Sequence, residues 1–235
     1  MVLTATPLGQ MATESADGRA DTTRQQILRA AAHQFARRAY HDVGLDDILA
    51  EAELTKGAMY FHFRSKHALA VAIIEQHKDD GRRAVEDLLA RQLSGLETLI
   101  DFCYLAAVRD ITRDVARAAS HLIESVGRTE GLQAQLLGGW IDMLAGVVQR
   151  AIAEGDVSDA WEPRDVGRLI VCMYMGLRQT SDMDDAKGFL LDLEKNCMLV
   201  LAGILQPDRV DYFKQFITRR TGLVINSLSA QASAS

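Results

Sequence analysis

Two short helical patterns, separated by a turn of two or three residues, constrain the N-terminal part of this chain most strongly. Residues 45–52 repeat apolar side chains at helical spacing for about two turns, and Thr55 can cap another short helix that continues to Phe61. Isolated helices of this length are unstable in water. We therefore expect both to be held in a small three-helix core, the helix-turn-helix arrangement, whose second helix is presented outward.

The remaining sequence is also typical of helices, so the expected fold class is all-α. A first helix is predicted to begin after Asp21 or Thr22 and to stop near Tyr40, and a fourth begins after the capping residue Ser65. Only three prolines and 17 glycines are present, too few for the frequent turns of a multi-stranded sheet. Longer helices are predicted over 96–110, 112–126, 130–154, 163–181, 186–205 and 208–220.

The periodicity divides the chain into two domains between two tails. Residues 1–21 are small and polar without periodicity, and residues 222–235 end in Ser, Ala and Gln, so both are predicted to be flexible. Residues 22–68 are expected to form the three-helix domain. Residues 69–221 are expected to form a larger helical domain.

Charge and cysteine usage limit the possible classes of protein. The net charge of -6 is unevenly distributed, because residues 19–83 carry 11 Lys and Arg against 9 Asp and Glu. This mildly basic N-terminal part permits local contact with phosphates. Three widely spaced cysteines favour a reduced, cytoplasmic chain over a disulfide framework. The N terminus lacks a secretory pattern, and the longest apolar runs have nine residues where a membrane span needs about 20.

The third helix is predicted to present a polar face that suits a DNA groove. Lys56 can pair with phosphate or guanine, Gly57 permits close backbone approach, and Tyr60 can donate a hydrogen bond or touch a thymine methyl group. Thr55 and Ser65 can donate hydroxyls to phosphates. The apolar side of the helix is assigned to Ala58, Met59, Phe61 and Phe63, with His62 and Arg64 emerging at its end.

These residues resemble a known family. The stretch from Gly44 to Leu69 reads GLDDILAEAELTKGAMYFHFRSKHAL and is similar to the helix-turn-helix of the TetR family of transcriptional regulators. The resemblance implies a homodimeric repressor that binds a palindromic operator and releases it when a small molecule binds the C-terminal domain. It also implies DNA contacts by Thr55, Lys56, Gly57, Tyr60 and His62, with Lys66 on a phosphate.

Three residues depart from that family's pattern. Ala39 stands where a glycine usually ends the first helix, and Gly44 replaces the Thr or Ser that usually caps the second helix. Glu53 occupies the turn position usually held by glycine, where φ tends to be positive. Each departure costs on the order of 1 kcal/mol. Because Asp46 and Asp47 add negative charge nearby, we interpret the pattern as weaker non-specific binding, with DNA binding retained.

The larger domain is expected to hold a small-molecule site. The motif KGAMYFHF and Trp140 resemble the γ-butyrolactone receptors, in which a tryptophan of the corresponding helix lines the ligand pocket, and this implies the same role for Trp140. Mostly apolar pockets with adaptable methionines suit a hydrophobic or amphipathic effector. Ordinary core packing is the alternative for each candidate. The candidates are Trp140, Met143, Phe102, Leu105, His121, Met173 and Tyr174.

Two helices of the larger domain are predicted to form a homodimer interface. The runs Leu169–Leu177 and Cys197–Leu205 are apolar around nearly the whole circumference, and such helices must be buried on all sides. Packing of helices 163–181 and 186–205 against their counterparts in a second copy would bury them. A two-fold dimer would place its two recognition helices about 34–36 Å apart, one turn of B-DNA.

Other functions receive less support from the sequence. The histidines lack metal-ligand spacing, and no nucleotide-binding or nucleophile motif appears, so we expect no metal, no cofactor and no enzymatic activity. We also expect no membrane association. Two alternatives stay open: a helical dimeric interaction or small-molecule-binding protein with a weakened helix-turn-helix, and an activator of the same family.

Overall fold

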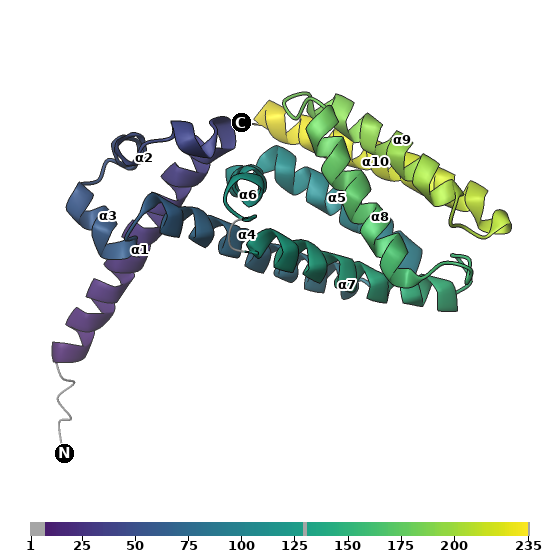
Figure 1. Cartoon of the computed structure of the whole chain (residues 1–235), viewed down its shortest axis with the longest axis horizontal. Helices are drawn as coiled ribbons and strands as arrows, with labels where there is room; N and C mark the ends of the chain where they lie inside the picture. Colours follow the sequence, from purple (N-terminus) through teal and green to yellow (C-terminus); the bar gives the residue numbers. More distant parts are fainter. Residues whose placement is uncertain (1–7, 129–130, 235) are drawn as a thin grey trace, which may run out of the picture. The chain divides into compact units, whose positions relative to one another are not determined.

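The computed structural model describes residues 8–128 and 131–234, which form helices joined by short connections (Figure 1). No β-strand occurs in these ranges, and the predicted all-α fold class is confirmed. The helices are α1 (Leu8–Arg37), η1 (Tyr40–Asp42, a 3-10 helix), α2 (Leu45–Ala52), α3 (Lys56–His62), α4 (Lys66–Leu89), α5 (Gly95–Thr112), α6 (Asp114–Ser125), α7 (Leu132–Ala153), α8 (Pro163–Thr180), α9 (Ala186–Ala202), η2 (Pro207–Arg209, a 3-10 helix) and α10 (Val210–Ala234).

The described chain forms two compact units. Unit 1 contains the residues up to His77 and the segment 114–128, and unit 2 contains residues 78–113 and those from 131 onward. The sequence instead placed the boundary after residue 68 and assigned α6 to the larger domain. Helix α6 belongs to unit 1 because it packs on α1, with Ala119 and Leu122 buried; small alanines allow two helices to approach closely.

Unit 1 is held together by apolar side chains from every one of its first four helices. Ile27 and Phe35 of α1, Ile48 of α2, Met59 of α3 and Ile73 of α4 are fully buried. Helices α2 and α3 have eight and seven residues, well below the length at which a helix is stable alone. Their stability therefore comes from this shared core, as the sequence predicts.

The terminal helices are longer than predicted. Helix α1 starts at Leu8 instead of after Asp21, and α10 continues to Ala234 instead of ending near residue 220, so helix replaces most of both expected tails. Apolar periodicity does not by itself set where a helix ends, because each added residue gains a backbone hydrogen bond at little cost. Residues 1–7 and 235 of the expected tails lie outside the described range.

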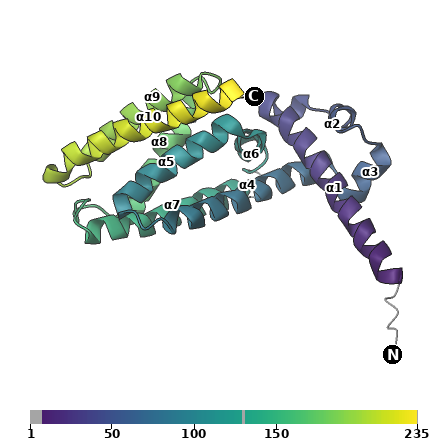
Figure 2. The same ribbon diagram turned by 180° about the vertical axis from the view of Figure 1, so that it is seen from behind.

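Unit 2 has one apolar core shared by α5 and α7–α10, and Figure 2 shows α9 and α10 running side by side. The buried hydroxyl of Tyr104 lies 2.6 Å from Thr221 Oγ1 and links α5 to α10. Where α5 crosses α7, a Cβ on Gly95 would lie 2.5 Å from the backbone nitrogen of Ala151, so only glycine fits. This core positions the helix surfaces considered below.

Helix α7 is long and apolar enough, by length and composition alone, to cross a membrane, and no other helix of the described ranges passes that test. Its Leu144 and Val148 are fully buried, and it packs against α5 and α8. Of the apolar segment that passes this test, 28% is buried within the described residues.

Candidate nucleic-acid interface

Helix α3 is anchored at both ends and along one side. Thr55 is its N-cap, and Thr55 Oγ1 accepts a hydrogen bond from the backbone N–H of Ala58 at 3.3 Å. Met59 is fully buried, and Phe63, which ends the helix, is also buried. These anchors fix the direction of the opposite face.

The outward face of α3 contains Lys56, Gly57 and Tyr60. All three are exposed, and Tyr60 keeps 53% of its surface accessible. A Cβ added at Gly57 would meet only Thr55 Oγ1 within 4 Å, at 3.9 Å, so a partner surface can approach the backbone closely. The structure thus groups these residues at the surface, while their contact with DNA stays a prediction.

The assignment of Phe61 to the apolar core side was wrong. Phe61 is 79% exposed, whereas Met59 is fully buried. Residues two apart on a helix point about 200° apart, so Met59 and Phe61 cannot share a face. Phe61 instead lies on the outward side near Tyr60, and the half-buried His62 ring meets the Phe61 ring edge-on at a centroid distance of 5.0 Å.

The charge of Lys56 is partly balanced within the protein. Lys56 Nζ lies 2.8 Å from Asp46 Oδ1, and both side chains are exposed. The hydrogen bond that Lys56 donates to Asp46 raises the pKa of Lys56, so the side chain is firmly cationic. An exposed pair of this kind is weak, and a phosphate can compete for the ammonium group.

Gly44 and Glu53, two departures from the family pattern, are accommodated locally. Asp47 Oδ2 accepts from the Gly44 backbone N–H at 2.8 Å and from Arg38 at 3.0 Å, and both bonds lower the pKa of Asp47. This carboxylate supplies half of a capping box although Gly44 has no side chain. Glu53 ends α2 with φ 53°, which confirms the predicted positive φ.

Lys66 is not placed for the phosphate contact that the resemblance implied. Its Nζ donates to the carbonyl oxygens of Tyr40 at 2.8 Å and Val43 at 2.9 Å, and it lies 4.4 Å from the centre of the Tyr40 ring. The ammonium group therefore holds the connection between α1 and α2 against α4. Sequence spacing cannot reveal this role, because the partners are backbone atoms more than 20 residues away.

Among the predicted pocket residues, Trp140 and Phe102 lie together. Their ring centroids are 5.5 Å apart. A Cβ added at Gly81 of α4 would lie 2.7 Å from Trp140 Cη2, so the indole packs directly on the α4 backbone. Gly81 was missed by the sequence reasoning, since nothing in the sequence around a glycine shows what packs on it.

The other candidates of unit 2 are less closely grouped. Met143, Met173 and Tyr174 are partly buried against its core, and Leu105 is half-buried on α5. The partial burial of these four residues fits the lining of a ligand pocket and ordinary core packing equally well.

A buried polar group anchors Tyr174. Its hydroxyl donates to Asp110 Oδ2 at 2.7 Å, and Arg178 Nε lies 2.9 Å from the same oxygen. Burial, followed by the charge of Asp110, raises the pKa of Tyr174 well above its ordinary value. Arg178 follows Tyr174 by one helical turn, a spacing that predicts a shared face, although the sequence did not identify Asp110 as their partner.

His121 does not belong with these residues. It is exposed on α6 in unit 1, where its Nδ1 lies 3.0 Å from the Phe35 carbonyl oxygen. Its assignment to the pocket assumed that α6 packs with its sequence neighbours α5 and α7. The buried alanines of α6 instead direct it onto α1.

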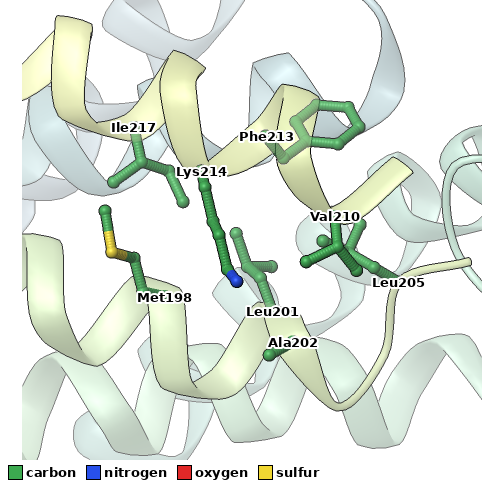
Figure 3. A pocket seen from close by; sticks show the side chains of 8 residues that line it. All are labelled: Met198, Leu201, Ala202, Leu205, Val210, Phe213, Lys214 and Ile217. Atoms are coloured by element: carbon green, nitrogen blue, oxygen red, sulfur yellow. The ribbon is translucent and has the colours of Figure 1, made fainter. Parts of the chain in front are cut away.

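A small apolar cavity lies between α9 and α10 in unit 2 (Figure 3). Its volume is about 10 Å³, and Met198, Leu201, Phe213 and Ile217 are among the side chains that line it. This space is that of a single water molecule. It is too small for an effector, and no predicted pocket residue lines it.

Comparison with known proteins gives consistent matches. Residues 27–73 match the family model described as bacterial regulatory proteins, tetR family. The A-factor receptor protein of Streptomyces griseus is 29% identical over 206 residues, which cover 83% of this chain and 68% of that protein.

Solved structures extend these matches over both units. A γ-butyrolactone receptor, described as ArpA-like, has a TM-score of 0.74 and 27% identity, with 87% of this chain and 98% of that chain covered. CprB of Streptomyces coelicolor, solved in complex with its operator sequence, has a TM-score of 0.75 and 28% identity with the same coverage.

The hydrogen bonds of Lys66 make a prediction about stability. Lys66→Met leaves the carbonyl oxygens of Tyr40 and Val43 without their donor, so it should lower the free energy of unfolding by about 1–3 kcal/mol. Urea denaturation measures this change. Lys56→Met on the exposed face of α3 is the matched control and should change stability by less than about 0.5 kcal/mol. Equal effects of the two substitutions would contradict the anchoring role.

Proposed function

Because the chain belongs to the TetR family of bacterial transcriptional regulators, we propose that it is a homodimeric repressor released from a palindromic operator by a small hydrophobic or amphipathic molecule. The family assignment makes it a DNA-binding regulator and not an enzyme. The observation that carries the DNA-binding part is the outward face of α3, which exposes Lys56, Tyr60 and Phe61 while Met59 is buried beneath them.

The chemistry of this face suits the major groove. Lys56 supplies a cation for a phosphate or a guanine, and Gly57 leaves its backbone open to close approach. Tyr60 and Phe61 offer apolar edges for thymine methyl groups, and Tyr60 adds a hydroxyl for a polar contact. The similar operator complex of CprB supports this assignment.

Asp46 tunes the affinity of this face. On DNA, Lys56 must exchange Asp46 for a phosphate, and Asp46 then repels the phosphate backbone. This cost applies to every DNA sequence, whereas base contacts by Tyr60 and Phe61 apply only to the operator. Asp46 therefore weakens binding to all DNA, while the ratio of operator affinity to non-specific affinity changes less.

Helices α8 and α9 support the proposed dimer. The inner sides of both helices are already buried in unit 2, for example at Leu177 and Leu201, so a second copy is not needed to cover the helices on all sides. Their outer sides still expose large apolar groups: Leu169 is 45% exposed and Leu199 is 77% exposed. A second copy packed on this side would remove that apolar surface from water.

Trp140 is the residue around which we place the effector site. It packs near Phe102 and against the α4 backbone at Gly81, and α4 continues along the chain into unit 1. A ligand that displaces Trp140 would alter its contact with α4. Such a ligand shifts the protein away from the DNA-binding conformer only if it binds the other conformer more tightly. The similarity to γ-butyrolactone receptors favours a ligand of that chemical size and polarity.

Repression is one of two regulatory outcomes open to this architecture. An activator would use the same α3 face and the same dimer, and it would differ in where the operator lies relative to the promoter. We further propose that the protein acts in the cytoplasm, where its DNA partner is found. Reporter expression with and without the protein separates the two outcomes.

Substitutions on α3 test the DNA-binding face. Lys56→Ala should reduce the slope of log affinity against log salt concentration by about one unit, because one phosphate contact is lost. Tyr60→Ala and Phe61→Ala should each weaken operator binding by about 1–3 kcal/mol and relax its sequence preference. Fluorescence anisotropy with DNA from upstream of the gene, titrated at several salt concentrations, measures both effects.

Two further variants complete this test. Asp46→Asn releases Lys56 and should strengthen binding to unrelated DNA, whereas Arg113→Ala, which removes an exposed cation outside α3, should leave binding unchanged. Wild-type affinity in the three α3 variants would rule out this face as the DNA contact.

Leu199→Glu tests the dimer interface. Leu199 is 77% exposed in the single chain, so a glutamate there leaves the fold intact but puts a charge into the proposed interface. The dissociation constant of the dimer should rise at least about tenfold. Sedimentation equilibrium, with a subunit mass of 25.9 kDa, measures it. Leu89→Glu, on an exposed site of α4, is the control, and a Leu199→Glu protein as dimeric as that control would refute this interface.

Gly81→Ala tests the effector site. The added methyl group would overlap Trp140, which must move, so we expect operator affinity to fall about fivefold or more without any effector. In a Trp161→Phe background Trp140 is the sole tryptophan, and its fluorescence reports the displacement. Gly139→Ala, where a Cβ meets nothing within 4 Å, is the control. A change in Trp140 fluorescence with unchanged operator affinity would contradict the coupling between the position of Trp140 and operator binding.

A further inference from the structure

A cleft with a strongly cationic wall lies on unit 2, between α10 and the turn that joins α4 to α5. Its volume is about 270 Å³. Arg91 and Leu93 come from the turn, and Phe216, Arg219 and Leu223 come from one side of α10, where residues three, four and seven apart align. The cleft contains no residue of the proposed DNA face or of the proposed effector site.

The lining of the cleft carries more positive than negative charge. Arg220 is paired with the buried Asp101, whose Oδ1 lies 2.7 Å from Arg220 Nε. In the described part of the chain, Arg91 and Arg219 form no ion pair, and the Arg219 guanidinium lies 5.7 Å from the centre of the Phe216 ring. The lining of the cleft thus holds three arginines against one carboxylate, Asp101, which pairs with Arg220 and also interacts electrostatically with Arg91. The cleft therefore keeps an excess of positive charge on a protein whose net charge is -6.

Glu97, a carboxylate that interacts electrostatically with Arg219, has hydrogen-bond donors of its own. Burial acts to raise the pKa of Glu97, but hydrogen bonds from the Tyr212 hydroxyl at 2.5 Å and the Ser94 backbone N–H at 3.0 Å, with a smaller effect of the Arg219 charge, lower it below its ordinary value. Glu97 is therefore held by its own partners. The guanidinium group of Arg219 keeps its donors for a ligand.

The rim of the cleft is fixed. Gln92 adopts φ 55°, which turns the chain sharply between Arg91 and Leu93. Arg150 donates to the Leu93 carbonyl oxygen at 3.1 Å and to Thr98 Oγ1 at 2.8 Å, which ties this turn to α5 and α7. The backbone of the turn that carries Arg91 and Leu93 is consequently held against α5 and α7.

We propose that this cleft binds a small amphipathic carboxylate, with the carboxylate held by Arg91 and Arg219 and the apolar chain lying over Leu93, Phe216 and Leu223. Guanidinium groups bind carboxylates through paired, charge-assisted hydrogen bonds. Leu93, Phe216 and Leu223 form the apolar floor of the cleft. This floor favours a ligand with a hydrocarbon chain over an inorganic anion, which has no such chain. The volume lies just below the roughly 300 Å³ of drug-sized pockets and limits the chain to medium length.

Isothermal titration calorimetry of the full chain with octanoate tests the proposal. Octanoate should bind the wild-type protein, and Arg91→Gln/Arg219→Gln should weaken binding about tenfold or more, because both anion contacts are lost. Arg82→Gln/Arg113→Gln removes the same two charges from exposed positions elsewhere and should keep the wild-type affinity. Leu223→Glu, at a position already 57% exposed, should also abolish binding through its effect on the floor.

Other outcomes would overturn the assignment. Octanol bound as tightly as octanoate would show that the arginines contribute nothing, and inorganic phosphate bound as tightly would show that the floor contributes nothing. Octanoate affinity lost in Trp140→Ala but kept in Arg91→Gln/Arg219→Gln would place the ligand at the proposed effector site instead. Equal losses of octanoate affinity in Arg91→Gln/Arg219→Gln and Arg82→Gln/Arg113→Gln would show that the effect comes from net charge alone.

Discussion

Burial of Met59 in the core of unit 1 is the constraint on which the proposed DNA-binding surface depends. Helix α3 has seven residues and cannot persist alone, so it exists only while Met59 and Phe63 are buried in unit 1, where α3 packs against α1. The same packing fixes which way the helix turns. Once Met59 points inward, Gly57 and Phe61, two residues away on either side, must point to solvent, and the surface proposed to meet DNA follows from a buried apolar contact.

Local patterns predicted much of this arrangement. The N-cap of Thr55, the exposure of Lys56 and Tyr60 and the positive φ of Glu53 all follow from rules that involve a few neighbouring residues. The error at Phe61 shows the limit of reading apolar character as burial, because helical geometry already placed it opposite Met59. Lys66 could not be predicted, since its partners are carbonyl oxygens brought near only by the fold.

Long-range packing explains the remaining differences in unit 2 and around α6. His121 was grouped with Trp140 from the order of the helices, yet α6 packs on α1 in the other unit. The need for glycine at position 81 becomes visible only in the structure, where the indole of Trp140 packs on it. The Asp110–Arg178 pair and the cleft beside Arg219 likewise join segments far apart in sequence. The proposed effector and carboxylate sites depend on such contacts, which periodicity alone cannot supply.

The most direct test of the central claim is a dimethyl sulfate footprint of the protein on its operator. Dimethyl sulfate reaches guanine N7 from the major groove and adenine N3 from the minor groove. If α3 of each subunit enters the major groove, guanine N7 should be protected in two patches about 10–10.5 base pairs apart on one side of the duplex. Protection of adenine N3 alone, or of a single patch, would contradict the account.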